Sequence, residues 1–212
     1  MNKTPCRTIV YVDGFNFYYG EVKGTAWKWL DPVTLFQKVL GPRNHIIKVK
    51  YFTAHVQPTP NDPGVGNRQN IYLQALQAHS PLVELHFGHF LRHRISMENC
   101  NPPPFSVEVW KNEEKGSDVN LALHVLNDAW LNIYDCAVIV SNDSDLSESL
   151  RMVKEKHKKL IGLITPGAPQ RKTSWKLRKY ADFIRPIRTW SLKSSQLPNP
   201  IPGTNIFKPL SW

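Results

Sequence analysis

The sequence predicts an α/β fold in which a mainly parallel central sheet is flanked by helices, and three observations support this. Apolar runs rich in β-branched residues recur at 8–12, 136–140 and 160–164. Apart from Thr8 they lack polar alternation, as strands buried on both faces of a parallel sheet do. Segments with helical patterning lie between them, and strands alternating with helices are typical of parallel sheets. Acidic residues directly follow two of the runs, where open α/β sheets form their functional crevice.

The first half of the chain supplies alternating elements. Asp13-Gly14 ends the first run, and the aromatic segment 16–19 then opens a helix. Asp31-Pro32 predicts a helix start, because aspartate caps helices and proline is favoured at the first helical position. Gly41-Pro42 ends that helix. The composition then predicts, in order, a strand at 46–56, a Pro- and Gly-rich loop at 57–67, a helix at 68–79 and a strand at 83–95.

The second half continues the alternation after three consecutive prolines at 102–104. The expected elements are, in order, an edge-like strand at 105–110, a helix at 118–130, the strand 136–140, a helix with Leu146, Leu150 and Val153 on one face, the strand 160–164 and a short helix at 175–180. Residues 191–212 are rich in proline and serine and are expected to be extended, packing back through Ile206, Phe207 and Trp212.

The net positive charge of the chain indicates which class of partner it binds. The 212 residues include 27 Lys and Arg against 17 Asp and Glu, and a basic balance of this size favours a polyanion, since cations neutralise phosphates. Much of the excess lies at 151–159 and 171–188, whereas acids cluster at 108–118 and 143–148. A basic region beside an acidic focus is typical of an enzyme that grips phosphates and places a cation among them.

The sequence also indicates the compartment. No run approaches the roughly 18 apolar residues of a membrane helix, so no membrane partner is expected. The N-terminus has no small-residue cleavage site of a signal peptide. The cysteines Cys6, Cys100 and Cys136 share no metal-ligand spacing, which excludes a zinc site and predicts free thiols in the cytoplasm.

Four aspartates stand at strand ends or at a helix start. Asp13 follows the first run, Asp143 and Asp145 follow the run 136–140, and Asp118 opens a helix. Each alone is as readily explained as a turn residue or a helix cap. Close carboxylates repel unless a cation relieves them, however, and hard oxygen ligands without Cys or His select Mg²⁺ or Mn²⁺. The four acids together therefore predict a cation site that could activate water for attack on a phosphate.

Three motifs occur in the order found in the NYN domain family, which belongs to the PIN-like nuclease superfamily, and the chain resembles this family over residues 7–188. The motifs are Val12-Asp13-Gly14-Phe15-Asn16-Phe17-Tyr18-Tyr19-Gly20, Lys115-Gly116-Ser117-Asp118-Val119 and Val140-Ser141-Asn142-Asp143-Ser144-Asp145-Leu146. The resemblance implies a PIN-like three-layer α/β sandwich and metal-dependent hydrolysis of RNA phosphodiester bonds. It assigns a nuclease domain to 7–188 and leaves 189–212 as a Pro/Ser-rich C-terminal tail.

The resemblance implies that all four aspartates are catalytic and metal-binding. Asp13 matches the first-strand acid, Asp118 the acid of the Lys-Gly-x-Asp motif, and Asp143 and Asp145 the paired acids after the later strand. Asp145 is expected to be the member most remote from the cation.

Five further residues are candidates for substrate binding. Asn16 matches a polar residue of the family that contacts metal-bound water or substrate. Asn142 stands where many relatives carry glycine, and asparagine tolerates left-handed backbone conformations. Lys115 could hold the scissile phosphate as a point charge, or be a solvated surface lysine. Ser141 and Ser144 could bond a phosphate or the aspartates, or stabilise the turn.

The leading hypothesis is a metal-dependent endoribonuclease using Mg²⁺ or Mn²⁺. One alternative is a non-catalytic RNA-binding or regulatory protein with a PIN-like fold. A less favoured one is a monooxygenase of pyridine derivatives, as some family members are labelled; the sequence has no Gly-rich dinucleotide fingerprint. RNA is the expected partner, with DNA not excluded because phosphate contacts do not distinguish the sugars. The oligomeric state stays open, a homodimer included.

Overall fold

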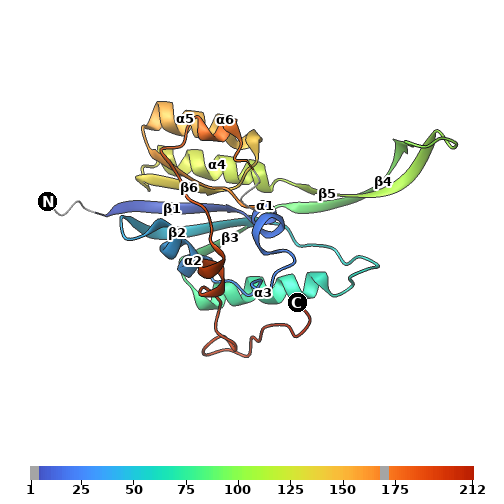
Figure 1. Ribbon diagram of the computed structural model, residues 1–212, viewed down its shortest axis with the longest axis horizontal. Coiled ribbons are helices and arrows are strands. Elements are labelled where there is room, and N and C mark those ends of the chain that lie inside the picture. Colours follow the sequence, from blue (N-terminus) through green and yellow to red (C-terminus); the bar gives the residue numbers. More distant parts are fainter. Residues whose placement is uncertain (1–4, 168–171) are drawn as a thin grey trace.

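A parallel six-stranded sheet forms the centre of the computed structural model, which describes residues 5–167 and 172–212 (Figure 1). Its strand order is β3-β2-β1-β6-β7-β8, and every neighbouring pair runs parallel. The strands of this sheet are β1 (Cys6–Asp13), β2 (Asn44–Thr53), β3 (Val83–Phe87), β6 (Cys136–Val140), β7 (Leu160–Ile164) and β8 (Phe183–Ile184).

Helices cover both faces of the sheet, so the predicted three-layer α/β sandwich is confirmed (Figure 1). One face is covered by α1 (Gly14–Phe17), the π-helix η1 (Tyr18–Val22), α2 (Pro32–Leu40), α3 (Val65–His79) and α7 (Thr189–Lys193). The other face is covered by α4 (Ser117–Trp130), the 3₁₀ helix η2 (Ser144–Leu146), α5 (Ser147–His157) and α6 (Trp175–Arg178).

The first strand connects the two hydrophobic cores. Val10 and Val12 pack into the core beneath α2 and α3, while Ile9 and Tyr11 pack into the core beneath α4 and α5. Successive side chains of a strand point to opposite faces, so a strand buried on both sides is apolar throughout. This explains why the runs 136–140 and 160–164 coincide with β6 and β7.

The predicted helix start at Asp31-Pro32 is confirmed. Oδ1 of Asp31 accepts hydrogen bonds from the backbone N–H groups of Val33 (2.9 Å) and Thr34 (3.3 Å). These groups have no partner inside the helix, so the carboxylate satisfies donors that would otherwise be unpaired. The helix ends at Leu40, and Gly41 follows with a positive φ of 73°.

The predicted single strand at 83–95 is wrong, because the chain changes partners at Gly88. Residues before it form β3, whereas β4 (His89–Glu98) leaves the sheet and pairs antiparallel with β5 (Ser106–Lys115). The expected edge strand at 105–110 is therefore part of a separate two-stranded ribbon, which projects from the body (Figure 1). A Cβ on Gly88 would lie 2.5 Å from the carbonyl oxygen of Lys115, so the crossing requires glycine. We call residues 89–115 the arm.

The C-terminal segment packs against the core beneath α2 and α3. Leu197 and Ile201 are buried, and the ring of Trp212 lies 5.6 Å from that of Trp29. Of the three residues expected to pack back, Ile206 and Trp212 contact this core, while Phe207 is 58% exposed.

Within the described residues, no helix combines the length and the apolar character needed to cross a bilayer. All three cysteines have free thiols. The first four residues of the N-terminus and the cation Arg171 lie outside the described residues.

Candidate functional site

The predicted acids lie between β1 and β6, where the strand order of the sheet reverses. From β1 the chain builds outward through β2 and β3, and later through β6, β7 and β8 on the other side. The crevice at such a switch point is where open α/β sheets bind ligands. Val12 and Val140 are paired neighbours on β1 and β6, so the segments after them, beginning at Asp13 and Ser141, leave the sheet side by side.

Asp13 is the buried acid of this site, with only 5% of its surface exposed. Its Oδ1 accepts a hydrogen bond from the backbone N–H of Asn16 (2.9 Å), and its Oδ2 accepts one from Oγ of Ser141 (2.8 Å). Burial raises the pKa of Asp13 despite these hydrogen bonds, and the charges of Asp143 and Glu114 raise it further. The carboxylate is thus held in one orientation in a place that disfavours an unneutralised charge.

Ser141 connects the acids of β1 and β6. Its buried hydroxyl donates to Asp13 and also accepts a hydrogen bond from the backbone N–H of Asp143 (3.0 Å). Asp143 in turn accepts from the backbone N–H of Asp145 through Oδ1 (3.0 Å) and so caps η2. The hydroxyl proton of Ser141 is therefore directed at Asp13, so Ser141 positions the carboxylate of Asp13 and the backbone of Asp143.

Asn16 and Asn142 join the site to the segment before α6. Oδ1 of Asn16 accepts a hydrogen bond from the backbone N–H of Asn142 (3.3 Å). The side chain of Asn142 donates to the carbonyl oxygen of Lys172 (3.2 Å) and accepts from the N–H of Ser174 (2.8 Å). In the described part of the chain only Asn132 and Lys158 among non-glycine residues have positive φ. Asparagine therefore serves here as a side-chain tether rather than as a left-handed turn residue.

Asp118 shows most clearly that the acids form one group. Burial raises its pKa to about 6, and four other carboxylates contribute to the rise. These are Asp13, Asp143, Glu114 and Asp145, in order of decreasing effect. We call these four residues and Asp118 the acid cluster. The other three predicted aspartates are thus close enough for their charges to affect Asp118.

Glu114, the fifth member, was not anticipated from the sequence. Its two carboxylate oxygens accept hydrogen bonds from the backbone N–H (3.1 Å) and Oγ (2.8 Å) of Ser117, at the start of α4. It lies on β5, so the arm contributes to the site. The sequence does offer one indication of its role, since Glu114 stands just before a helix start, where an acid interacts favourably with the helix dipole. Within the acidic segment 108–118, nothing else in the sequence distinguishes Glu114 from its neighbours.

The remaining predicted residues lie at the margin. Nζ of Lys115 is 2.9 Å from Oε1 of Glu113, and both occupy the face of β5 opposite Glu114 because strand side chains alternate. Asp145 is exposed, and Ser144 is partly buried at the start of η2. Lys115 is thus oriented away from the acid cluster.

The donor set of the acid cluster fits a hydrated Mg²⁺ or Mn²⁺. Considering residues 5–167 and 172–212, no group of three or more His, Cys, Asp or Glu side chains is arranged closely enough to enclose a metal ion. Mg²⁺ commonly keeps several waters and binds proteins through one or two carboxylates. The pKa values of Asp13 and Asp118 are raised first by burial and then by the neighbouring carboxylates, and such a cation would stabilise the ionised form of both acids.

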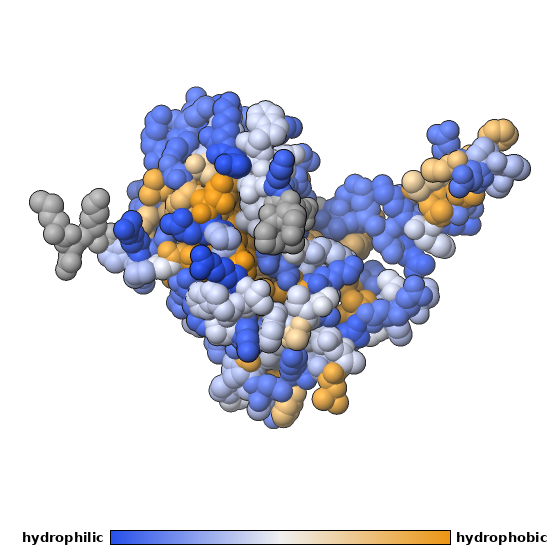
Figure 2. All heavy atoms as spheres, viewed as in Figure 1, coloured by the Kyte–Doolittle hydropathy of each residue, from blue (hydrophilic) through white to orange (hydrophobic). Residues whose placement is uncertain are grey.

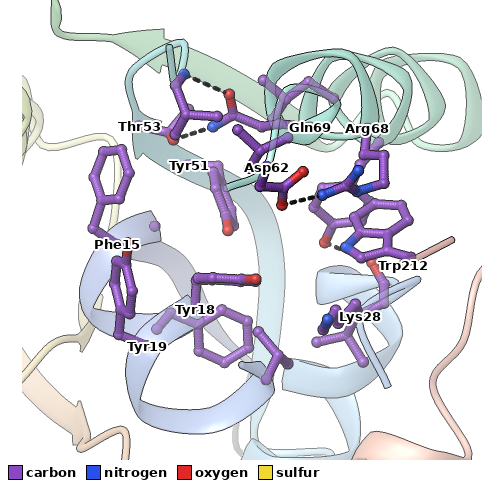
Figure 3. A pocket seen from close by; sticks show the side chains of 18 residues that line it. Phe15, Tyr18, Tyr19, Lys28, Tyr51, Thr53, Asp62, Arg68, Gln69 and Trp212 are labelled. Atoms are coloured by element: carbon purple, nitrogen blue, oxygen red, sulfur yellow. Dashed lines mark hydrogen bonds and ion pairs between the residues drawn. The ribbon is translucent and has the colours of Figure 1, made fainter. Parts of the chain in front are cut away.

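A pocket lined by aromatic side chains opens beside the acid cluster. Its volume is about 190 Å³, and it lies between η1, the end of β2 and the start of α3 (Figure 3). Gly14 and Phe15, which directly follow Asp13, form part of its wall. Tyr18, Tyr51 and Trp212 contribute further aromatic surface. We call this the aromatic pocket.

The arm carries an exposed surface of cations and an aromatic ring. The guanidinium groups of Arg92 and Arg94 lie 4.7 and 5.8 Å from the ring centre of Trp110, which is 59% exposed. Figure 2 shows further hydrophobic residues on the outer part of the arm, among them Met97 and Phe105. Arg, Lys and aromatic side chains together are typical of surfaces that bind single-stranded nucleic acid.

The histidines that are close to these arginines in the sequence lie apart from them. His89 and His93 occupy the opposite face of β4, since they alternate with Arg92 and Arg94. His86 lies on β3, with its ring stacked 4.7 Å from that of Phe52. This face of the arm therefore carries the two arginines and Trp110 without the histidines.

Comparisons with known proteins agree with this architecture. The family model described as NYN domain matches residues 7–188. The 6-hydroxy-3-succinoylpyridine 3-monooxygenase HspA of Pseudomonas putida (strain DSM 28022 / S16) is 34% identical over 240 aligned positions, covering 100% of this chain and 77% of that protein. A crystal structure of VPA0982, a protein of unknown function from Vibrio parahaemolyticus RIMD 2210633, superposes with a TM-score of 0.54 and 18% identity, covering 89% of this chain and 98% of that one. The last similarity concerns the fold alone.

Proposed function

The chain belongs to the NYN domain family, and on this premise we propose that it is a metal-dependent endoribonuclease with Asp13, Asp118, Asp143 and Asp145 in its active centre. Membership of this family supports a PIN-like nuclease. RNA is the proposed substrate, with DNA as the alternative to be tested beside it. We also propose a cytoplasmic location, which accords with the free thiols. The oligomeric state stays open.

The observation that carries this proposal is the gathering of carboxylates where β1 and β6 end and α4 begins, with Asp13 and Asp143 joined through Ser141 and Glu114 bonded to Ser117. Burial and these neighbouring carboxylates together raise the pKa of Asp118 to about 6. A binding protein for RNA gains nothing from five acids beside a negatively charged phosphate. A hydrolase does gain, because the same acids retain a divalent cation where the phosphate must bind. The basic balance of the chain supports a polyanionic substrate.

Each residue of the site has a proposed task. Asp13, Asp118 and Asp143 would hold a hydrated Mg²⁺ or Mn²⁺, one or two of them directly and the rest through its bound water. Asp145 and Glu114 would add charge from further away. When bound, the cation supplies charge stabilisation at the phosphate and lowers the pKa of a bound water. Ser141 ties the carboxylate of Asp13 to the backbone N–H of Asp143 and so holds the two acidic segments together.

Substrate contacts are proposed for the rim of the site. Asn16 and Asn142 connect the acid cluster to the segment that carries Lys172, so they would place that cation near the phosphate backbone. Ser144 could donate its hydroxyl to a phosphate oxygen. Lys115 would meet the substrate only after leaving Glu113.

The test is cleavage of labelled RNA and DNA in Mg²⁺, in Mn²⁺ and in EDTA. Replacing Asp143 by Asn should lower the rate more than about 100-fold, because residues that merely support metal ligands already cost about 10–100-fold. Asp135→Asn is the matched control, since Asp135 pairs with Arg7 at the opposite ends of the strands. RNA that is bound but remains uncut would favour a non-catalytic RNA-binding or regulatory protein.

A monooxygenase acting on a pyridine derivative is the second candidate, and two observations favour it. The relative named 6-hydroxy-3-succinoylpyridine 3-monooxygenase is 34% identical over the whole of this chain, and the aromatic pocket could take a pyridine ring. The sequence lacks a Gly-rich dinucleotide fingerprint. NADH oxidation that depends on 6-hydroxy-3-succinoylpyridine would establish this activity, and its absence would remove the candidate.

A further inference from the structure

We propose that the aromatic pocket binds a planar heteroaromatic ring that carries an anionic group. The ring would lie against Tyr18 and Tyr51, and the anion would face Arg68 and Lys28 (Figure 3). Binding requires neither metal nor cleavage, so this site is independent of the proposed nuclease activity.

The size and lining of the pocket suit a single ring. An engineered apolar cavity of about 150 Å³ is known to take up benzene, and this pocket measures about 190 Å³. Aromatic side chains reach it from η1, from β2 and from Trp212 (Figure 3). Flat rings are favoured between such walls because aromatic faces and edges carry opposite partial charges.

Tyr51 gives the pocket a polar group without a partner. The residue is 6% exposed, and its side chain points into the pocket (Figure 3). Its raised pKa arises from burial and from the charges of Asp13 and Tyr18, with no hydrogen bond from any described residue. By contrast, the hydroxyl of Tyr72 donates to the carbonyl oxygen of Leu30 (2.8 Å). The Tyr51 hydroxyl reaches the open space of the pocket, where a ring nitrogen or exocyclic oxygen of a ligand would accept its hydrogen bond.

The charges on one side of the pocket favour an anion. Arg68 is paired with Asp62 through one of its terminal nitrogens, which leaves other guanidinium N–H groups for a ligand. Lys28 lines the same pocket and lowers the pKa of Asp62 from a distance. Two cations thus face one carboxylate, a net charge of +1 on these three side chains.

The pocket is held in shape before any ligand arrives. The amide of Gln69 donates to Thr53 (3.4 Å) and to the carbonyl of Ala54 (3.0 Å), and accepts from the N–H of Val56 (2.9 Å) (Figure 3). A Cβ on Gly14 would lie 2.7 Å from the ring of Tyr51, so only glycine allows this ring so close to the turn after Asp13. Preformed walls reduce the entropy lost on binding.

Two kinds of ligand combine a heteroaromatic ring with an anionic group. A nucleotide of an RNA strand combines a heteroaromatic base with phosphate, and the pocket begins at the two residues that follow Asp13. A free heteroaromatic carboxylic acid has the same two parts. The experiment distinguishes them by its choice of probes.

The test is isothermal titration calorimetry in EDTA with adenosine and cytidine 5′-monophosphate, pyridine-3-carboxylate and uncharged pyridine-3-carboxamide. We expect heat of binding with at least one anionic probe. Nucleotides alone would identify a base site for RNA, and the carboxylate alone a site for a free acid. Equal binding of the carboxamide and the carboxylate would overturn the anion requirement, and no binding by any probe would overturn the site.

Variants then locate the binding. Arg68→Gln should weaken the anionic probe about 10-fold or more, the size expected for a lost charged hydrogen bond, and Tyr51→Phe a few-fold. Arg178→Gln and Tyr180→Phe on the opposite face of the sheet are the matched controls and should bind as the parent does. Lys28→Gln repeats the charge test should Arg68→Gln unfold. Unchanged affinity in both Tyr51→Phe and the charge variant would overturn the assignment of the ligand to this pocket. A parent protein that binds the ring but does not cleave RNA would overturn only the proposed nuclease activity.

Discussion

Replacing Asp118 by Asn should stabilise the metal-free protein at neutral pH. Its pKa is raised from 3.8 to about 6 by burial and by the surrounding carboxylates. Because the folded pKa lies above the unfolded one, ionisation disfavours folding. That penalty is absent below about pH 4 and complete above about pH 6, so the parent protein loses stability as the pH rises through this window. Asparagine has nearly the same shape as aspartate but does not ionise, so the variant avoids this penalty.

The size of the effect follows from the shift. Each pKa unit corresponds to about 1.36 kcal/mol, so the rise from 3.8 to about 6 sets an upper limit of about 3 kcal/mol. Asp118 is only half-buried, and solvent screening reduces the figure to about 1–2 kcal/mol. For a protein of this length that corresponds to an increase in Tm of about 2–8 °C. By pH 5 the gain should have fallen to roughly half, because the folded parent is then mostly protonated at Asp118.

The assay is urea denaturation of parent and variant in EDTA at pH 7.5, 5.0 and 4.0. Asp135→Asn should change stability in the opposite direction, since Arg7 lowers the pKa of Asp135, and by no more than about 1 kcal/mol for an exposed pair. Added Mg²⁺ or Mn²⁺ should stabilise the parent more than Asp118→Asn. An Asp118→Asn protein that is less stable than the parent at pH 7.5, or that gains equally at all three pH values, would refute the mutual repulsion of the acid cluster.

Three further predictions follow from other contacts. Ser141→Ala should lower kcat for RNA about 10–100-fold with its circular dichroism spectrum unchanged, because the carboxylate of Asp13 and the backbone of Asp143 lose the hydroxyl that joins them; an unaltered kcat would contradict this role. Asp128→Asn should cost about 3–5 kcal/mol in urea denaturation, since it strands the buried ammonium of Lys50 2.7 Å away; a cost below about 1 kcal/mol would show that the pair is dispensable. Arg92→Ala with Arg94→Ala should reduce the salt dependence of RNA affinity, measured by fluorescence anisotropy, by about 1.4 in the log–log slope; an identical slope would exclude the arm from phosphate contacts.

Much of the fold was predictable because burial leaves a simple mark on the sequence. The strands β6 and β7 are buried on both faces, so their apolar runs end where the strands end. Asp31-Pro32 marked a helix start through backbone chemistry that acts locally. The arm was not predictable in this way. The residues on both sides of Gly88 have strand composition, and only their partners differ.

The same division applies to the site. Asp13, Asp143 and Asp145 could be grouped because parallel strands bring their carboxyl ends to one edge, and Asp118 because it opens a helix. Glu114 joins them from an element whose position was unknown, and strand alternation turns Lys115 away from them. The aromatic pocket draws on η1, β2, α3 and Trp212, segments that are distant in sequence and carry no shared motif. Features set by neighbouring residues, such as strand ends and helix starts, are therefore predictable from the sequence. The position of Glu114 and the aromatic pocket depend on tertiary packing and are not.

The most direct test of the proposed endoribonuclease compares RNA cleavage by the parent, Asp143→Asn and Asp135→Asn proteins at matched concentrations of Mn²⁺ and in EDTA. We predict cleavage by the parent and by Asp135→Asn, dependent on Mn²⁺, and a loss of more than about 100-fold in Asp143→Asn. Cleavage that persists in EDTA, or at the parent rate in Asp143→Asn, would contradict an active centre built on the acid cluster.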